Sequence, residues 1–331
     1  MRSPFQALTD AGLATALALI DASRNPQPGR STMESFEALR RKHTQDVRRF
    51  TPEAVDHLDW TRQQVLDNQT VRLREVVAHA QQESPYHAER LGHLDASQLE
   101  LNDLPSIPPM TKADVMDHWD AIVTDRRLRL EGVVEHLDRL HKGQQDNFYH
   151  LDQYYAAATG GTSGKRGVFL WDWETFVVTA NITYRMDVQQ DRKHPPQGRR
   201  RTAVICAGSY VHASRLLFPT MLDPQREVLV VAAGTPIGKI IEQLNEYQPD
   251  RIVGYASIVE ELSAESLDGR LRIKPQRIST NSEPLLPEAR RMAQQAWGVN
   301  VHNSWGSVEI GVAAMEGESF GGATLAEDFV I

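Results

Sequence analysis

The chain has 331 residues, of which 40% are apolar and 24% are charged, a composition typical of a globular protein rather than a disordered or fibrous one. Its formal net charge of -8, from 36 basic and 44 acidic side chains, supplies no overall positive field for nucleic acid. No stretch approaches the roughly 20 apolar residues that span a membrane, and the single cysteine, Cys206, excludes an intrachain disulfide. The sequence therefore predicts a cytoplasmic protein that binds neither membranes nor nucleic acid.

Residues 1–32 differ in composition from the remainder, and Met33 is a second candidate start. Two interpretations stay open for this segment: a leader or an artificial extension. Residues 33–150 are charged, poor in glycine and rich in helix formers, with apolar side chains at helical spacing. We therefore expect residues 33–150 to form a mainly helical N-terminal region.

The helical periodicity is interrupted by three prolines in residues 105–109. Thr111 follows with Asp114 three residues later, a spacing that predicts a helix N-cap at Thr111. A further helix is expected over residues 128–140. His136, His141 and His150 lack tight metal-ligand spacing and are expected to be solvated.

Residues 151–331 alternate β-rich and helical runs, which favours βαβ units and a largely parallel sheet. Ligands of such sheets gather beyond the carboxyl ends of the strands. Cys206 falls within an apolar run and is expected to be buried rather than nucleophilic. The predicted strands are 202–206, 227–233, 251–255, 277–280 and 299–301, and the predicted helices are 237–247, 258–265 and 287–297.

The most informative segment is a glycine-rich loop from Thr159 to Gly167, which contains four glycines. Glycines permit close backbone approach, and the hydroxyl, amide and lysine donors of this loop suit a phosphate group. Two other interpretations are a flexible hairpin and the phosphate loop of a small-molecule kinase. The kinase template requires glycine at Thr159, Ser or Thr at Arg166 and a helix after Lys165. Because β-formers follow instead, we expect the loop to join two strands.

Residues Thr159–Lys165 resemble the phosphate loop of the acyl-CoA synthetase, peptide-synthetase adenylation and luciferase superfamily, especially its phenylacetate–CoA ligase branch. Further segments agree with that branch in order, from about Asp59 to the end of the chain. They are Ser84-Pro85-Tyr86-His87, Ile107-Pro108-Pro109-Met110-Thr111-Lys112-Ala113-Asp114, Ser282-Glu283-Pro284-Leu285, Asn303-Ser304-Trp305-Gly306-Ser307-Val308-Glu309 and Glu327-Asp328.

The resemblance implies an α/β adenylation domain that binds ATP and Mg²⁺, with Lys165 and Glu309 as its catalytic residues and Glu309 as the metal ligand. The implied acyl pocket is lined by Tyr210, His212, Gly234, Tyr255, Ala256 and Ser257. The implied nucleotide-binding residues are Thr159, Gly160, Gly161, Thr162, Ser163, Gly164, Asn281, Ser282, Glu283, Pro284, Asn303, Trp305 and Gly306.

The sequence departs from the family at several positions. Val308 stands where relatives carry a phosphate-contacting hydroxyl, Arg166 replaces a common proline, and Asn303 and Trp305 replace a usual Asp and Tyr. The chain also stops at Ile331, before the family's ribose-binding Asp and its small C-terminal domain with the catalytic lysine. Two explanations stay open: a truncated acyl-CoA ligase, or a short member such as those of phenazine antibiotic biosynthesis.

The resemblance implies ATP-dependent activation of an aromatic or heteroaromatic carboxylate, for example a phenazine carboxylate, as an acyl-adenylate with release of pyrophosphate. It further implies that this chain alone makes no thioester and that the adenylate passes to a downstream reductase or amide-forming transferase. The alternative is a non-catalytic nucleotide- or acyl-binding scaffold that keeps the fold, an interpretation favoured by Val308 and opposed by Lys165 and Glu309.

Overall fold

The computed structural model describes residues 36–144, 147–160, 166–193, 195, 198–215, 226–317 and 323–327. All of them belong to one unit, Ser35–Ile331.

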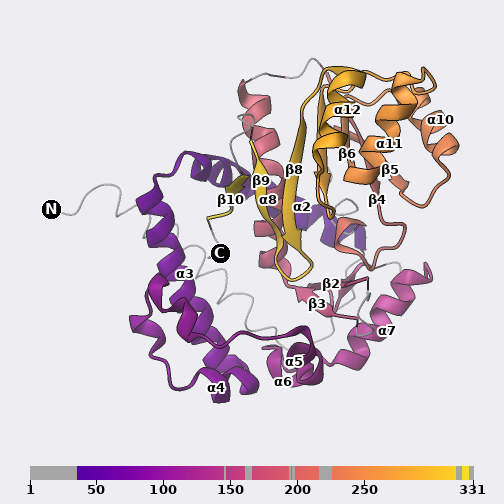
Figure 1. The fold of residues 1–331 in the computed structure, drawn as a ribbon. Helices are drawn as coiled ribbons and strands as arrows, with labels where there is room; N and C mark the ends of the chain where they lie inside the picture. Colours follow the sequence, from indigo (N-terminus) through magenta and orange to yellow (C-terminus); the bar gives the residue numbers. More distant parts are fainter. Residues whose placement is uncertain are drawn as a thin grey trace. The chain divides into compact units, whose positions relative to one another are not determined.

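The N-terminal part of this unit is helical, as predicted (Figure 1). Helix α3 begins at a capping box in which Thr61 and Gln64 satisfy each other's backbone N–H groups. Thr111 and Asp114 form the same arrangement at the start of α5, which confirms the predicted N-cap. The helices are α2 (Phe36–Asp56), α3 (Arg62–Glu83), α4 (Pro85–Leu91), α5 (Lys112–Asp117), α6 (Trp119–Ile122) and α7 (Leu130–His141).

A small antiparallel sheet follows, formed by β1 (Tyr149–His150), β2 (Tyr154–Ala158) and β3 (Val168–Trp171). Strands β2 and β3 are the two strands that flank the glycine loop, which confirms that the loop joins strands rather than opening a helix. Burial of Ala156 and Ala158 against α7 fixes the face of β2 on which the loop begins.

The main sheet has seven strands in the order β10-β9-β8-β7-β6-β4-β5. The five strands from β8 to β5 are parallel, whereas β9 and β10 add antiparallel pairs at the β8 edge. The predicted α/β class with a largely parallel sheet is therefore confirmed. The strands are β4 (Arg200–Cys206), β5 (Arg226–Ala232), β6 (Arg251–Tyr255), β7 (Arg277–Asn281), β8 (Val301–Ser307), β9 (Gly311–Glu316) and β10 (Ala323–Leu325).

This strand order contains a reversal between β4 and β6. From β4 the chain adds β5 on one side, then returns to the other side and adds β6, β7 and β8 in sequence. A crevice opens at such a switch point, beyond the carboxyl ends of the two strands that flank it. The topology therefore directs a ligand toward the segments that follow Cys206 and Tyr255.

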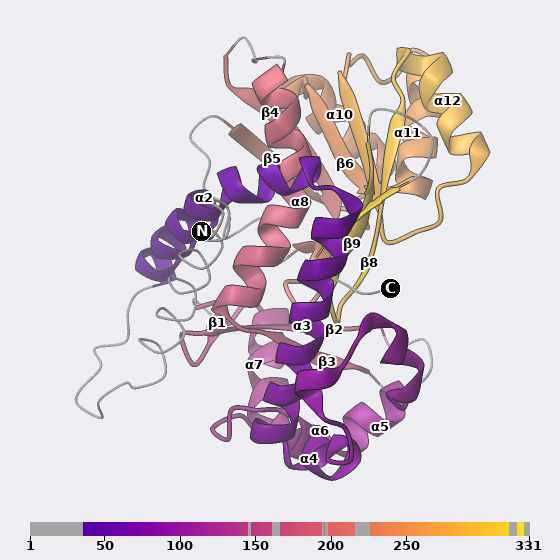
Figure 2. The same ribbon diagram turned by 90° about the vertical axis from the view of Figure 1, so that its left-hand side faces the viewer.

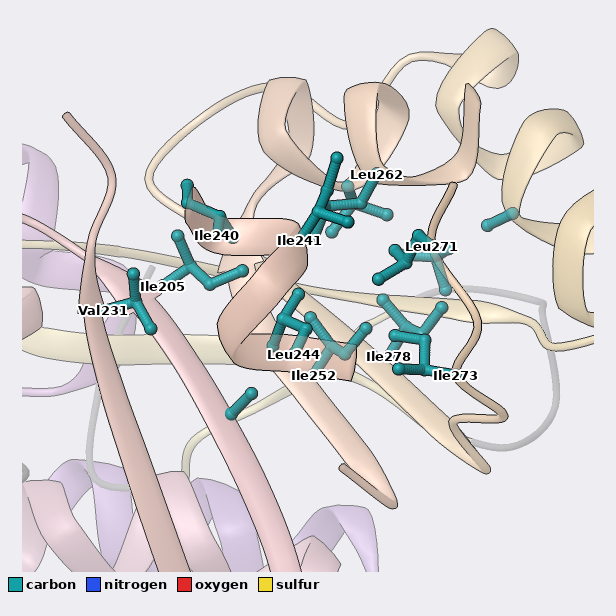
Figure 3. Close-up of a cluster of buried hydrophobic side chains, with 14 residues drawn as sticks. Ile205, Val231, Ile240, Ile241, Leu244, Ile252, Leu262, Leu271, Ile273 and Ile278 are labelled. Atoms are coloured by element: carbon teal, nitrogen blue, oxygen red, sulfur yellow. The ribbon is translucent and has the colours of Figure 1, made fainter. Parts of the chain in front are cut away.

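Helices cover both faces of the sheet (Figure 2). On one face lie α10 (Ile237–Tyr247), α11 (Ala256–Leu267) and α12 (Pro287–Trp297); on the other lie α2 and α8 (Trp173–Lys193). Apolar side chains of α10 and α11 interdigitate with those of β4, β6 and β7 to form the core under the first group (Figure 3). Cys206 is buried, as predicted, and burial raises the pKa of its thiol.

Three features differ from the sequence-based expectation. Helix α8 was not predicted, because its first half is rich in β-branched and aromatic residues that have weak helix propensity. The strand expected over residues 299–301 begins at Val301 and continues to Ser307 through the glycine-containing motif. His136 is 1% exposed rather than solvated, because its ring packs beside His150 and hydrogen-bonds the carbonyl of Phe148.

None of the helices in the described ranges is long and apolar enough to cross a membrane.

Candidate active site

The carboxyl ends of the parallel strands bring together most of the described residues that the sequence motifs single out. Tyr210 and His212 follow β4, Gly234 follows β5, and Ala256 and Ser257 follow β6, which itself ends at Tyr255. The turn at residues 281–284 follows β7, and Asn303 lies on β8 beside it. These segments neighbour one another because the strands that carry them are hydrogen-bonded neighbours.

The base of the glycine loop is held closed by Thr159. Its backbone N–H donates to the carbonyl of Gly167 over 3.0 Å, and its hydroxyl accepts the N–H of Gly167 over 2.9 Å. Lys112 Nζ lies 3.3 Å from the same hydroxyl, so a lysine from α5 reaches the loop base across 47 residues. Arg166 donates to the Thr159 carbonyl over 3.2 Å. Gly160 is exposed, whereas the placement of Gly161, Thr162, Ser163, Gly164 and Lys165 lies outside the described residues.

The turn after β7 is tied to the start of α11. Ser282 has a φ of 64°, a left-handed conformation that reverses the chain immediately after Asn281. The Oε2 atom of Glu283 accepts the backbone N–H of Ser257 over 2.9 Å. Helix starts leave N–H groups without an intrahelical partner, and the Glu283 carboxylate satisfies one of them at α11. Pro284 is exposed beside this contact.

Asn303 is fixed on β8 from both sides. Its side-chain oxygen accepts from Thr280 Oγ1 over 3.0 Å, and its backbone N–H donates to Glu316 Oε2 over 2.9 Å. Glu316 is in turn held by Arg290 at 2.6 Å. The amide Nδ2 of Asn303 has no partner in the described part of the chain, so it can donate to a ligand.

Trp305 on β8 is 55% exposed, so a ligand could stack on its ring. Gly306 follows at a β-bulge, where an added Cβ would overlap the carbonyl oxygen of Gly311 on β9. Only glycine therefore fits at this position. Antiparallel pairing with β9 holds Trp305 and Gly306 in the strand, and the turn begins at Val308.

Glu309 lies in this turn between β8 and β9 and is exposed. The turn is anchored because Trp171 Nε1 donates to the carbonyl of Val308 over 3.0 Å. Gly311 has a φ of +71° and lies so close to α8 that a side chain at this position would collide with Thr179. Glu309 is thus carried on a firmly held turn, next to the strand that follows the glycine loop.

The segments at the switch point contact each other directly. Ser214 Oγ and Tyr255 Oη are 3.3 Å apart, which bridges the end of β6 and the turn after β4. The ring of Tyr210 packs edge-on against Phe148 with centroids 4.5 Å apart, and Arg215 lies over its other side. Gly234 is exposed, with no atom within 4 Å of the position that a Cβ would occupy.

His212 belongs to the loop base rather than to the far side of the crevice. Burial lowers the pKa of His212, and the nearby Arg166 and His141 lower it further. Its imidazole is therefore neutral near pH 7 and can accept or donate one hydrogen bond. The carbonyl of Val211, the preceding residue, accepts the N–H of Ala158 over 2.8 Å and holds the turn after β4 against β2.

Two residues at this site were not assigned a role from sequence. Lys112 was noted only as part of a motif, and its proximity to Thr159 depends on the packing of α5 against β3 through Met116 and Val168. Glu316 carries no local signal, because its contact with Asn303 arises from β8–β9 pairing. Within the described ranges, no group of three or more His, Cys, Asp or Glu side chains could hold a metal ion unaided.

A cavity of about 1110 Å³ lies between α2, α8 and the sheet. Of the six residues predicted for the acyl pocket, only Tyr210 lines it. Arg215, which lies over Tyr210, lines it as well, so the cavity adjoins the candidate active site at these two residues.

No family model matches the sequence. Protein CapK of Staphylococcus aureus is 21% identical over 251 residues, covering 73% of this chain and 49% of CapK, so the chain spans about half the length of this relative. Among solved structures, 2-hydroxyisobutyryl-CoA ligase with 2-HIB-AMP and CoA, in its thioesterification state, superposes with a TM-score of 0.58 at 14% identity, over 78% of this chain and 53% of that one. Its open conformation gives 0.55, over 75% and 55%.

At these identities the likeness establishes the fold. The chain has the fold of 2-hydroxyisobutyryl-CoA ligase, which agrees with the fold that its sequence motifs imply.

Proposed function

We propose that the protein activates a carboxylic acid with ATP, forming an acyl-adenylate and releasing pyrophosphate. One observation carries this proposal: the segments 255–257 and 281–284 and Asn303 meet at the carboxyl edge of adjacent strands in an adenylate-forming fold. The hydrogen bond between Glu283 and Ser257 holds the turn proposed to bind adenine beside the segment proposed to bind the acyl group. An acyl-adenylate contains both groups and needs both segments close together.

The reaction needs little from side chains beyond orientation and charge neutralisation, because an ionised carboxylate is itself the nucleophile for the α-phosphorus. Thr159, Thr162, Ser163 and Lys165, with backbone amides of the glycine loop, would hold the phosphates. Lys112 adds a second cation at the loop base, 3.3 Å from the Thr159 hydroxyl. Asn303 would donate its Nδ2 to the adenine, and the exposed Trp305 would line the purine.

The proposed metal is Mg²⁺, a hard cation that takes oxygen ligands. Glu309 is a suitable oxygen donor because it is exposed and held on an anchored turn. Because Glu309 is the single protein carboxylate proposed at this position, the other ligands of Mg²⁺ would be phosphate oxygens of the nucleotide. When bound, the metal would neutralise phosphate charge.

For the acid itself we propose an aromatic or heteroaromatic carboxylate, with phenylacetate–CoA ligase-like specificity and a phenazine carboxylate as one candidate. Tyr210 and Tyr255 offer rings on the two sides of the switch-point crevice, which suits a flat substrate. A reductase or an amide-forming transferase would be a suitable acceptor of the activated acyl group.

A second candidate is a protein that binds nucleotide or acyl groups without chemistry. It is favoured by Val308, which has an apolar side chain, packed against the buried cluster that includes Trp171 and Phe176, where the family carries a hydroxyl. This candidate predicts binding of Mg·ATP or an acyl-adenylate analogue with no turnover of any acid.

The experiment that separates the two is exchange of labelled pyrophosphate into ATP, screened over a panel of aryl and heteroaryl carboxylates. We expect exchange that depends on a particular acid. Tight binding of an acyl-adenylate analogue, with no exchange for any acid, would favour the binding protein instead. Thioester formation is measured in parallel by adding coenzyme A.

A further inference from the structure

Four neighbouring strands of the main sheet each begin with an arginine: Arg200 on β4, Arg226 on β5, Arg251 on β6 and Arg277 on β7. Arg200 is paired with Arg226, and Arg251 with Arg277, while Arg251 is also paired with Thr202. Because side chains alternate along a strand, this register puts all four on one face of the sheet. We call these four residues the arginine ladder; it lies at the amino ends of the strands, opposite the candidate active site.

The ladder faces α8, which supplies two carboxylates. Asp187 lies 2.6 Å from Arg251 and 3.3 Å from Arg277, and Asp191 contacts Arg200 and lies 3.6 Å from Arg226. Despite its burial, the surrounding arginines hold the pKa of Asp187 below its ordinary value, so it is ionised at neutral pH. Among the described residues, four guanidinium groups face two carboxylates, an excess of two positive charges.

The excess is buried. The side chain of Arg251 is 4% exposed, and its Nε finds no hydrogen-bond acceptor among the residues that the structure describes. The same is true of the Nε atom of Arg200 and of the hydroxyl of Thr202, a residue that is 8% exposed. Buried donors and charges without partners are costly. The Nε atoms of Arg200 and Arg251 and the hydroxyl of Thr202 can therefore donate to a ligand.

Three residues of the ladder, Arg226, Arg251 and Arg277, line the cavity of about 1110 Å³. Its other walls come from the strands, from α2 and α8, which Figure 2 shows beside the sheet, and from Phe148, Tyr210 and Arg215. Asp187 is the one carboxylate among the described lining residues. The lining arginines are Arg40, Arg48, Arg192, Arg199, Arg215, Arg226, Arg251 and Arg277.

We infer that this cavity binds a multivalent oxyanion, a small molecule with two or more negative charges on phosphate or carboxylate groups. Guanidinium groups bind both kinds of oxyanion through paired N–H donors, and two charges on the ligand would balance the ladder. Thr202 would donate its hydroxyl as a neutral contact beside Arg251. None of the described residues of the glycine loop lines the cavity, and the inference does not depend on the proposed adenylation.

The test is calorimetric titration of the full chain at fixed ionic strength in a metal-free buffer that contains no chelator, ATP or acid. One arm uses inorganic pyrophosphate and the other citrate, so the tighter arm identifies the oxyanion class. We expect saturable binding of at least one. Thr202→Val, which preserves shape, and Arg277→Gln should each weaken binding, the arginine change by roughly tenfold or more.

Two matched controls locate the site. Arg201→Gln changes the next residue of β4, whose side chain lies over Tyr247 and does not line the cavity. Lys112→Ala changes the glycine-loop base, where pyrophosphate would also bind as a product of the proposed adenylation. Both variants should retain the binding that Thr202→Val and Arg277→Gln weaken. The inference is overturned if neither anion binds saturably, if Lys112→Ala abolishes binding, or if Thr202→Val and Arg277→Gln both bind with unchanged affinity. If Arg277→Gln does not fold, Thr202→Val still tests the inference, because this substitution is isosteric.

Discussion

The carboxylate of Glu283 caps the first turn of α11 by accepting the backbone N–H of Ser257 over 2.9 Å. This bond joins the turn after β7 to the end of β6, two segments 26 residues apart. A helix start is locally electropositive, so a carboxylate there is favoured over a neutral acceptor.

We predict that Glu283→Ala destabilises the protein by about 1 kcal/mol, the usual cost of a lost cap, and raises the KM for the acid or ATP. Thermal unfolding and steady-state exchange kinetics measure the two effects. Ser257→Ala is the matched control for stability: it retains the backbone N–H that makes the bond, and should unfold like wild type. An equal loss of stability in both variants would show that the bond is not its cause.

Glu309→Gln should leave the fold intact, because the side chain is exposed and makes no described contact, yet reduce adenylation roughly 100-fold or more. The amide keeps the size of the side chain and removes its charge. The rate is measured at saturating Mg²⁺, and circular dichroism checks the fold. A wild-type rate would mean that Glu309 has no part in the reaction.

Lys112→Ala should weaken the use of ATP by roughly tenfold, through loss of one cation near the phosphates. Lys239→Ala, on the exposed side of α10, is the matched control and should have no effect. Lys165→Ala should also weaken ATP use, and Arg166→Ala less so. The readout is the KM for ATP in the exchange assay; unchanged values for Lys112→Ala and Lys165→Ala together would make the loop a simple hairpin.

Gly306→Ala should lower the melting temperature substantially, since the added methyl group would overlap the Gly311 carbonyl and disrupt the β8–β9 pairing. Gly234→Ala is the control, because its Cβ would meet nothing within 4 Å. Differential scanning calorimetry of the two variants measures their melting temperatures. If Gly306→Ala melts like wild type, the bulge at Trp305 tolerates a side chain and is not a constraint on the site.

Stability should fall as the pH drops from about 6.5 toward 4. Burial is the main cause that lowers the pKa of His43 to about 4, with Lys42 adding to it, while the Trp173 carbonyl opposes the shift. Burial and His150 likewise lower the pKa of His136 to about 4. Both histidines are neutral when folded and take up a proton on unfolding below pH 6.5, so acid favours the unfolded state, by roughly 3 kcal/mol for each residue.

Urea unfolding at pH 7 and pH 4.5 measures this loss, and His43→Leu should reduce it by removing one of the two groups. A second loss is expected below pH 4.5. Burial would raise the pKa of Glu327, but hydrogen bonds from His57 and Arg185 lower it to about 2, so its ion pair is lost only as the pH falls toward 2. A flat stability profile between pH 7 and 4.5 would contradict the neutral, buried state of the two histidines.

Sequence patterns predicted those elements whose boundaries are set locally. The bounds of α10, β6 and α12 agree with the prediction because glycine and proline punctuate these short alternating runs. The path of β8 could not be predicted in this way. Residues Asn303–Ser307 have weak strand propensity, and only pairing with β9 and β7 makes them a strand.

The same distinction applies to the candidate site. The motifs located the strand ends, but Lys112 reaches Thr159 through packing between helix α5 and strand β3, which leaves no local pattern. The arginine ladder has no local signature either, because its four arginines lie far from one another in the sequence and become a cluster only when the strand order is known. The expectation of a solvated His136 was wrong because its burial depends on the packing of α7 against Phe148 and His150.

The most direct test of the proposed activity follows an oxygen atom. The protein is incubated with Mg·ATP and a competent carboxylate labelled with ¹⁸O in both oxygens, and the AMP that is released is analysed by mass spectrometry. If the carboxylate attacks the α-phosphorus, one ¹⁸O remains on the phosphate of AMP after the adenylate is cleaved at its carbonyl carbon. We predict AMP that carries one ¹⁸O, formed only when the acid is present. AMP without label, or nucleotide cleavage that ignores the acid, would contradict carboxylate adenylation.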